Sequence, residues 1–138
     1  LAAHDGEKGR FGEHGLGFLG GKPDGSGFSG AEALADGIAA ALKRPVTLVQ
    51  GAAGAIQNVA WCSGGAQGYF EAAIAAGADA FITGEISEPQ AHYAREMGVT
   101  FIACGHHASE RYGAPAVAAH VASQFGLVHE FIDIDNPA

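Results

Sequence analysis

GADAFITGE at residues 77–85 and GVTFIACGH at residues 98–106 share one pattern: glycine, a largely apolar run, then glycine and a polar residue. Near-continuous apolar runs of this length are typical of strands that are covered on both faces, as in a parallel sheet flanked by helices. The echo between the two stretches is too short to indicate a repeat architecture. The two stretches therefore predict strands of an α/β domain.

Helical and strand patterns alternate along the rest of the chain. The expected helices are 31–43, 66–77, 87–98 and 107–125, the last interrupted near 113–115. The expected strands are 46–51, 56–62, 79–84, 99–105 and 127–134. Ser29 and Ser87 are candidate helix N-caps, and Pro45 ends the first helix. This order predicts an α/β fold with a layered, largely parallel or mixed sheet flanked by helices.

The first thirty residues are rich in glycine and show little periodicity. We interpret 1–30 as a linking segment and 31–138 as one α/β lobe. GLGFLG at residues 15–20 matches G-x-G-x-x-G, but turn-like sequence flanks it on both sides, whereas a dinucleotide site needs a strand before the glycines and a helix after them. A glycine-rich loop or edge hairpin is the better interpretation.

Composition narrows the classes of partner. The net charge is −8, with 7 Lys and Arg against 15 Asp and Glu, which disfavours binding to nucleic acid. No apolar run approaches about 18 residues and no secretory leader pattern is present, so we expect no membrane partner. Cys62 and Cys104 have no CxxC spacing and indicate reduced thiols in a cytoplasmic protein.

Polar residues gather at three expected strand-to-helix junctions, which are 62–65, 83–85 and 105–107. Ligands of open parallel sheets bind beyond the carboxyl ends of the strands. If these strands are parallel, all three junctions lie at the same edge. Ser63 does not fit G-x-S-x-G, and a nucleophile is a weaker interpretation of it than an anion-binding turn.

His106 and Glu110 are four residues apart, so on a helix they share one face. An imidazole with a carboxylate suits Zn, Mn, Fe, Co or Ni better than Ca. Catalytic metal sites take three or more protein ligands, and Glu85, His92 and His107 are the nearby donors. The alternative is that His106 and Glu110 only hydrogen-bond to each other at a helix start. For Glu85 the alternative is a favourable charge at a helix N-terminus, and for His92 a partly buried helical position.

Several motifs together resemble the Nif-three-like family, whose bacterial, YbgI-like members are labelled GTP cyclohydrolase I type 2. CSGG, DAFITGE, the downstream His92 and GHHASER occur in the family's order and at close to its spacing, and FIDIDNPA at the end is also similar. The resemblance spans residues 57–138.

The resemblance implies a dinuclear divalent-metal site between two similar α/β lobes, in proteins that form ring-shaped homo-hexamers. By this pattern His106 and Glu110 are metal ligands. Glu85 and His92 lie close to the site and are the candidates for proton transfer. The implied function is that of a metal-dependent hydrolase of an unidentified small molecule. The alternative is a non-catalytic metal-handling or interaction protein built on the same ring.

The chain departs from the family pattern at its N-terminal end. The family takes further ligands from a His-His pair and an Asp of the N-terminal lobe, and His4 and Asp5 do not fit that pattern. We therefore expect a fragment that lacks this lobe and holds only part of the metal site.

Overall fold

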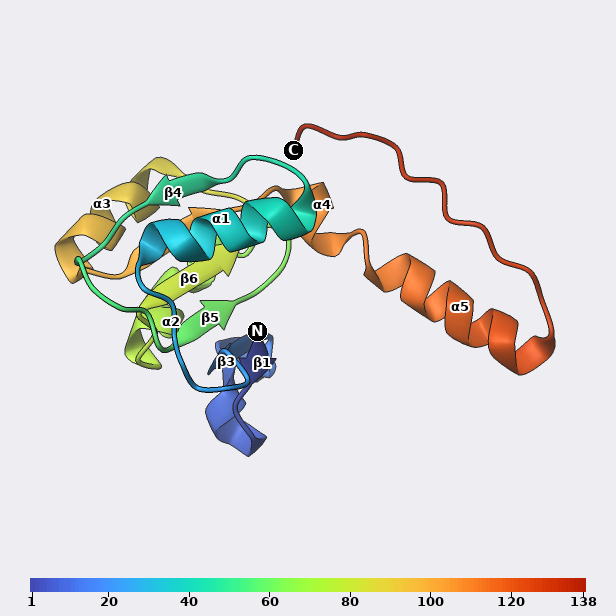
Figure 1. Cartoon of the computed structure of the whole chain (residues 1–138), viewed down its shortest axis with the longest axis horizontal. Helices are drawn as coiled ribbons and strands as arrows, with labels where there is room; N and C mark the ends of the chain where they lie inside the picture. Colours follow the sequence, from blue (N-terminus) through green and yellow to red (C-terminus); the bar gives the residue numbers. More distant parts are fainter.

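A mixed seven-stranded sheet forms the centre of the computed structural model, which describes residues 1–138 (Figure 1). The strands are β1 (Ala2–Ala3), β2 (Arg10–Phe11), β3 (Gly17–Gly21), β4 (Thr47–Val49), β5 (Val59–Trp61), β6 (Ala80–Thr83) and β7 (Thr100–Ala103). Their order is β1-β3-β5-β6-β7-β4, and β2 pairs with β3. The pairs β5–β6 and β6–β7 are parallel, whereas β3–β5 and β4–β7 are antiparallel. The predicted α/β fold with a mixed sheet is confirmed.

Five helices accompany the sheet, of which three cover its two faces and the last one projects away from it. They are α1 (Ala31–Leu42), α2 (Phe70–Ala75), α3 (Glu88–Met97), α4 (His106–Glu110) and α5 (Gly113–Phe125), with short 3₁₀ turns at Gly6–Gly9, Glu13–Gly15 and Gln67–Tyr69. The expected helix over 66–77 is thus a 3₁₀ turn followed by the shorter α2. The expected helices 31–43 and 87–98 are present as α1 and α3, and their ends differ from the expected ones by at most one residue.

The core consists of two apolar layers, one on each side of β6 and β7. Phe81 and Phe101 point to one face, where Phe70 of α2 packs edge-on against Phe101 at 4.9 Å between ring centroids. Ile82 and Ile102 point to the other face and pack under α1. Because successive residues of a strand face opposite sides, continuous apolar runs fill both layers.

Helix ends follow local sequence signals, with one correction. Helix α3 begins after Ser87, has Pro89 in its first turn, and ends at Gly98 with φ +70°. The expected cap Ser29 is wrong, because α1 begins after Gly30, which lies between Ser29 and the helix. Ser87 takes the N-cap position, but its side chain makes no capping hydrogen bond.

The glycine-rich first segment joins the sheet through β1, β2 and β3. GLGFLG overlaps β3, which pairs antiparallel with β1, β2 and β5, so the edge-hairpin interpretation is confirmed. Phe18 of β3 stacks on Trp61 of β5 at 5.7 Å between ring centroids. The division of the chain at residue 30 stays a prediction.

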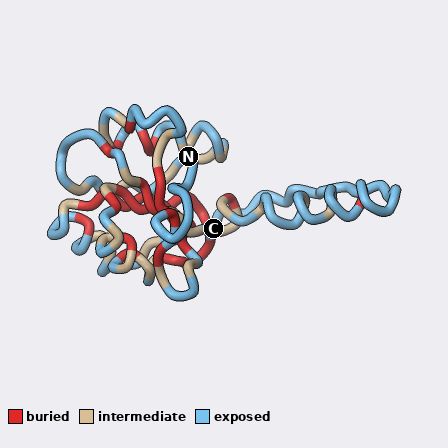
Figure 2. Tube along the Cα trace, turned by 90° about the horizontal axis from the view of Figure 1, so that it is seen from below, coloured by how far each residue is buried: buried red, intermediate tan, exposed pale blue.

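The end of the chain leaves the sheet. Helix α5 projects from the body, and Ala122 is its single buried residue (Figures 1 and 2). The expected interruption of this helix is present, but it lies at residues 111–112, between α4 and α5, and 113–115 are the first residues of α5. The expected strand over 127–134 is wrong: this segment runs beyond the sheet, where no neighbouring strand offers backbone partners. None of the helices combines the length and the apolar character that crossing a bilayer requires.

Candidate functional site

The three polar junctions meet at one edge of the sheet, as expected for parallel strands. Their backbones continue the sheet beyond the strand ends. The amide of Gly84 donates to the Gly64 carbonyl at 2.8 Å, and the amide of Gly105 donates to the Gly84 carbonyl at 2.9 Å. The junctions therefore form one connected surface rather than three independent loops.

Two hydroxyl side chains fix this surface. Thr83 is buried, and its Oγ1 donates to the Gly64 carbonyl at 3.0 Å and accepts from the Ala66 amide at 3.2 Å. Ser109 Oγ accepts from the Gly64 amide at 2.9 Å and donates to the His106 carbonyl at 2.9 Å. Sequence reasoning missed both roles, because a hydroxyl next to a motif does not reveal which distant backbone group it binds.

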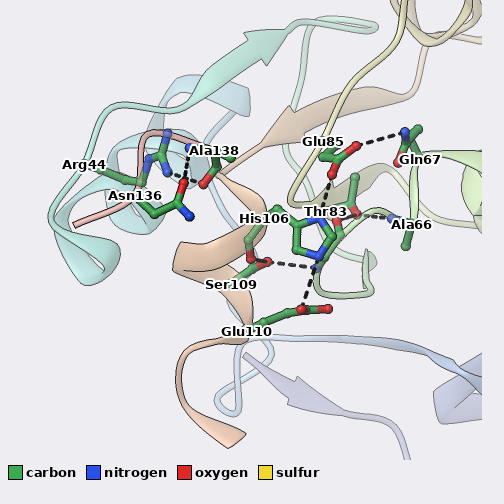
Figure 3. Close-up of polar contacts among 11 residues, drawn as sticks. Arg44, Ala66, Gln67, Thr83, Glu85, His106, Ser109, Glu110, Asn136 and Ala138 are labelled. Atoms are coloured by element: carbon green, nitrogen blue, oxygen red, sulfur yellow. Dashed lines mark hydrogen bonds and ion pairs between the residues drawn. The ribbon is translucent and has the colours of Figure 1, made fainter. Parts of the chain in front are cut away.

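His106 lies between two carboxylates (Figure 3). Its Nδ1 donates a hydrogen bond to Glu85 Oε1 at 2.5 Å, and its Nε2 is 3.2 Å from Glu110 Oε2. Glu85 follows β6, whereas His106 and Glu110 are the first and last residues of α4. The structure thus brings together three of the four predicted site residues.

The charges of the cluster shift two pKa values in opposite directions. The hydrogen bond that His106 donates to Glu85 is the main cause that raises the pKa of His106. The charge of Glu110 raises it further, and desolvation partly opposes both. The hydrogen bond from His106 is the main cause that lowers the pKa of Glu85, helped by Gln67, whose amide donates to Glu85 Oε2 at 3.3 Å. The arrangement favours a charged imidazolium–carboxylate pair when no cation is present.

Gly64 lets the loop approach the cluster closely. It has φ +69°, and a Cβ at this position would collide with the carboxylate of Glu110 and lie 3.1 Å from His106 Nε2. Gly84 is equally confined, since a Cβ there would lie 2.7 Å from the Cα of His106. The two glycines are therefore required by the geometry of the site.

Three other residues considered in the sequence form no hydrogen bond or ion pair with the side chains of this cluster. His92 is exposed on α3, and its side chain makes no hydrogen bond or ion pair. The Nε2 of His107 is 3.5 Å from Asp133 Oδ1, so it faces the chain's last segment rather than Glu110. Ser63 is exposed and without a hydrogen-bond partner.

The end of the chain forms one wall of the site. A cavity of about 340 Å³ is lined by Glu85, His106, His107, Glu110, Arg111, Asn136 and Ala138. Arg44 holds this end in place by donating to the backbone oxygens of Pro137 and Ala138 at 3.0 Å each. The sequence offered no signal for this contact, which joins residues more than ninety positions apart.

Metal ligation by this chain rests on few donors. The chain holds no cluster of three or more His, Cys, Asp or Glu side chains that could bind a metal. Glu110 and the Nε2 of His106 face each other and could bind one cation together, while Glu85 would hold the imidazole by its other nitrogen. Cys62 and Cys104 are free, as predicted, and burial raises the pKa of both thiols, which disfavours the thiolate form that binds metals.

Fold and site together define an α/β protein with a histidine–carboxylate centre at the carboxyl edge of a mixed sheet. The sequence model of the Duf34/NIF3 (NGG1p interacting factor 3) family matches residues 4–137, and the chain belongs to this family.

Similar proteins are known from bacteria. A "GTP cyclohydrolase 1 type 2 homolog" of Allochromatium vinosum is 54% identical over 97 residues, which are 70% of this chain and 38% of that protein. A protein of the same name from Neisseria meningitidis serogroup B is 50% identical over 106 residues, 77% of this chain and 43% of that protein. The chain thus spans about two fifths of the length of these two relatives.

Solved structures share the fold. The structure of ybgI, described as of unknown function, matches with a TM-score of 0.84 and 38% identity over 95% of this chain and 53% of that chain. A Thermus thermophilus protein matches with a TM-score of 0.69 and 30% identity over 76% of this chain and 42% of that chain. The whole fold described above, including most of the projecting end, therefore has a counterpart in a longer protein.

Proposed function

We propose that this chain supplies His106 and Glu110 to a divalent-metal centre of a metal-dependent hydrolase. One observation supports this most directly: Nδ1 of His106 donates to Glu85, so Nε2 is the ring nitrogen left for a cation to replace its proton, on the side where Glu110 lies. Metal-binding histidines usually donate their other ring N–H to a carboxylate or carbonyl in this way.

The donor set limits the metal. One imidazole nitrogen and one carboxylate oxygen suit Zn, Mn, Fe, Co or Ni. When bound, such an ion lowers the pKa of a coordinated water and polarises the group to be cleaved. Glu85 keeps the ring of His106 oriented, and Ser109 and Gly64 hold the loop close to both ligands.

Further ligands have to come from outside the His106–Glu110 pair, because a catalytic metal takes about three protein ligands. The longer relatives have more than half of their length beyond the matched region. We propose that this additional lobe, within a homo-oligomeric ring, completes a two-metal centre. The name of the relatives suggests hydrolytic chemistry on a nucleotide-like small molecule.

A second candidate is a non-catalytic metal-handling protein. The side chains of His106, Glu85 and Glu110 are 40% to 50% exposed, and an open site with two ligands favours release of the ion over tight retention. Turnover separates the two functions: a screen of nucleotide and phosphoester substrates with the metal-loaded full-length protein should show hydrolysis only for an enzyme.

The ligand assignment is tested by metal binding itself. We expect the purified chain to bind Mn²⁺ or Zn²⁺ in calorimetric titration, with the mass in solution measured in parallel. His106→Ala should abolish binding, whereas His92→Ala is the matched control, since His92 is exposed and outside the cluster. Undiminished metal uptake by His106→Ala would refute the assignment.

A further inference from the structure

A second cavity, of about 440 Å³, lies between α1 and the carboxyl ends of β5 and β6. Ten of its fourteen lining residues are hydrophobic and none of the lining side chains is charged, so it differs in character from the acidic site near His106. Leu34 and Ile38 of α1, Trp61 of β5 and Ile82 of β6 form much of its surface. Its volume lies within the range of small-molecule sites, about 300–1,000 Å³.

Gly37 forms part of the wall of this cavity. It lies in the interior of α1, where glycine costs about 1 kcal/mol relative to alanine. A Cβ at Gly37 would meet no atom within 4 Å, so packing within the chain does not require a glycine there. Because Gly37 lines the cavity, its missing side chain enlarges the space available to another molecule.

The polar side chains of the cavity are neutral. Burial raises the pKa of Cys62 and Cys104, which keeps both thiols protonated. The hydroxyls of Thr83 and Ser109 are already engaged with backbone groups. Ser63 is exposed and offers the one hydroxyl without a partner, so the lining provides mainly apolar contact and few free polar groups. Such a lining excludes an ionic group and accepts a neutral one.

The cavity and the candidate metal site share a wall. Ser109 lines the cavity, and the same hydroxyl binds the backbone of His106 and of Gly64. Ser63, next to Gly64, also lines the cavity. A molecule bound here would therefore reach the loop against which His106 and Glu110 pack.

We propose that this cavity binds the neutral, ring-sized, mainly apolar part of the substrate of the His106–Glu110 centre. The identification of this ligand as the substrate rests on the proposed hydrolase function. The cavity as a binding site does not, because it is formed by residues that take no part in metal ligation.

Trp61 makes the test specific, since it is the single tryptophan of the chain and lines the cavity. We would titrate the metal-free chain with nitrobenzene, a neutral ring that quenches indole fluorescence on contact. Saturable quenching is expected. Gly37→Leu should fill the cavity and weaken the apparent affinity by about tenfold or more, equivalent to about 1.4 kcal/mol.

Gly113→Leu is the matched control, because a Cβ at Gly113 also meets no atom within 4 Å and Gly113 is the first residue of α5, outside the cavity. It should leave quenching unchanged, and circular dichroism should show that both variants are folded. Quenching that is linear in nitrobenzene and equal in the wild type and Gly37→Leu would overturn the proposal and indicate a cavity covered by another protein segment.

Metal binding to the same variants separates this proposal from the preceding one. Gly37→Leu should bind Mn²⁺ like the wild type, since Gly37 is remote from both ligands in the sequence and absent from their cavity. If quenching is saturable but neither this chain nor the full-length protein binds metal, the ligand is not the substrate of a metal centre. The cavity would then still be a binding site.

Discussion

Glu85 accepts a hydrogen bond from Nδ1 of His106 at 2.5 Å, joining the end of β6 to the first residue of α4. This contact determines which nitrogen of the imidazole is left to bind a metal. With Nδ1 bound to Glu85, Nε2 is the nitrogen that faces Glu110.

Replacing Glu85 with Gln should weaken metal binding without removing a ligand. The loss of such an orienting carboxylate typically lowers metal affinity 10–100-fold. Calorimetric titration with Mn²⁺ would measure the change. Glu88→Gln is the control for charge, because Glu88 is exposed in the first turn of α3. Equal affinity of the wild type and Glu85→Gln would contradict an orienting role.

The stability of the metal-free chain should depend on pH through the same pair. The pKa of His106 is raised above 6.5, so its contribution is fully present below that pH and is lost as pH rises through the raised value. The pKa of Glu85 is lowered below 4.5, so its contribution is present above that pH and is lost as pH falls through the lowered value.

The destabilisation caused by Glu85→Gln in the absence of metal should therefore be largest between pH 4.5 and 6.5. It should shrink as pH rises through the raised pKa of His106 and as pH falls through the lowered pKa of Glu85. Urea unfolding of both proteins across this range measures the difference in the free energy of unfolding. A difference that does not vary with pH would show that the pair is not charged in the folded state.

Gly64→Ala should damage both stability and metal binding. A left-handed conformation costs a residue with a Cβ about 1–2 kcal/mol, and this Cβ would also push against Glu110 and His106. Thermal unfolding and Mn²⁺ titration would report the two effects. Gly68→Ala serves as the control, since a Cβ at Gly68 meets no atom within 4 Å. A Gly64→Ala protein with unchanged metal affinity would show that the close approach is dispensable.

Phe101→Ala should strongly destabilise the fold. Phe101 is fully buried, and its ring packs edge-on against Phe70 and Phe81. Removing such a ring typically costs about 3–5 kcal/mol. Phe125→Ala removes the same group from a position that is 74% exposed and should change stability by less than about 0.5 kcal/mol. Chemical unfolding measures the free energy of unfolding of both variants. A similar loss of stability in the two would mean that α5 is buried in solution.

Much of the fold was predictable from local sequence. The central strands β6 and β7 were evident because their apolar runs fill two layers at once. Pro45 and Gly98 marked helix ends through their backbone preferences. The pairing of His106 with Glu110 followed from four-residue spacing on one helix.

The direction of the edge strands and the structure of the last residues of the chain were harder to predict from the sequence. The pattern over 46–51 indicated a strand. That this strand runs antiparallel beside β7 depends on partner residues more than fifty positions away in the sequence. The segment 127–134 was expected to be a strand, but a strand pairs its backbone with a neighbouring strand, and this segment has none in the chain.

The sequence by itself thus determined the fold class, the two buried central strands and the His106–Glu110 pair, because each depends on the order of nearby residues. Only the tertiary structure decided that Glu85, and not His92, binds the imidazole of His106. It also decided that Arg44 binds the end of the chain beside the site and that Gly37 lines a cavity. These three features depend on contacts between segments that are distant in the sequence. The geometry of such contacts is set only when the sheet and its helices have packed.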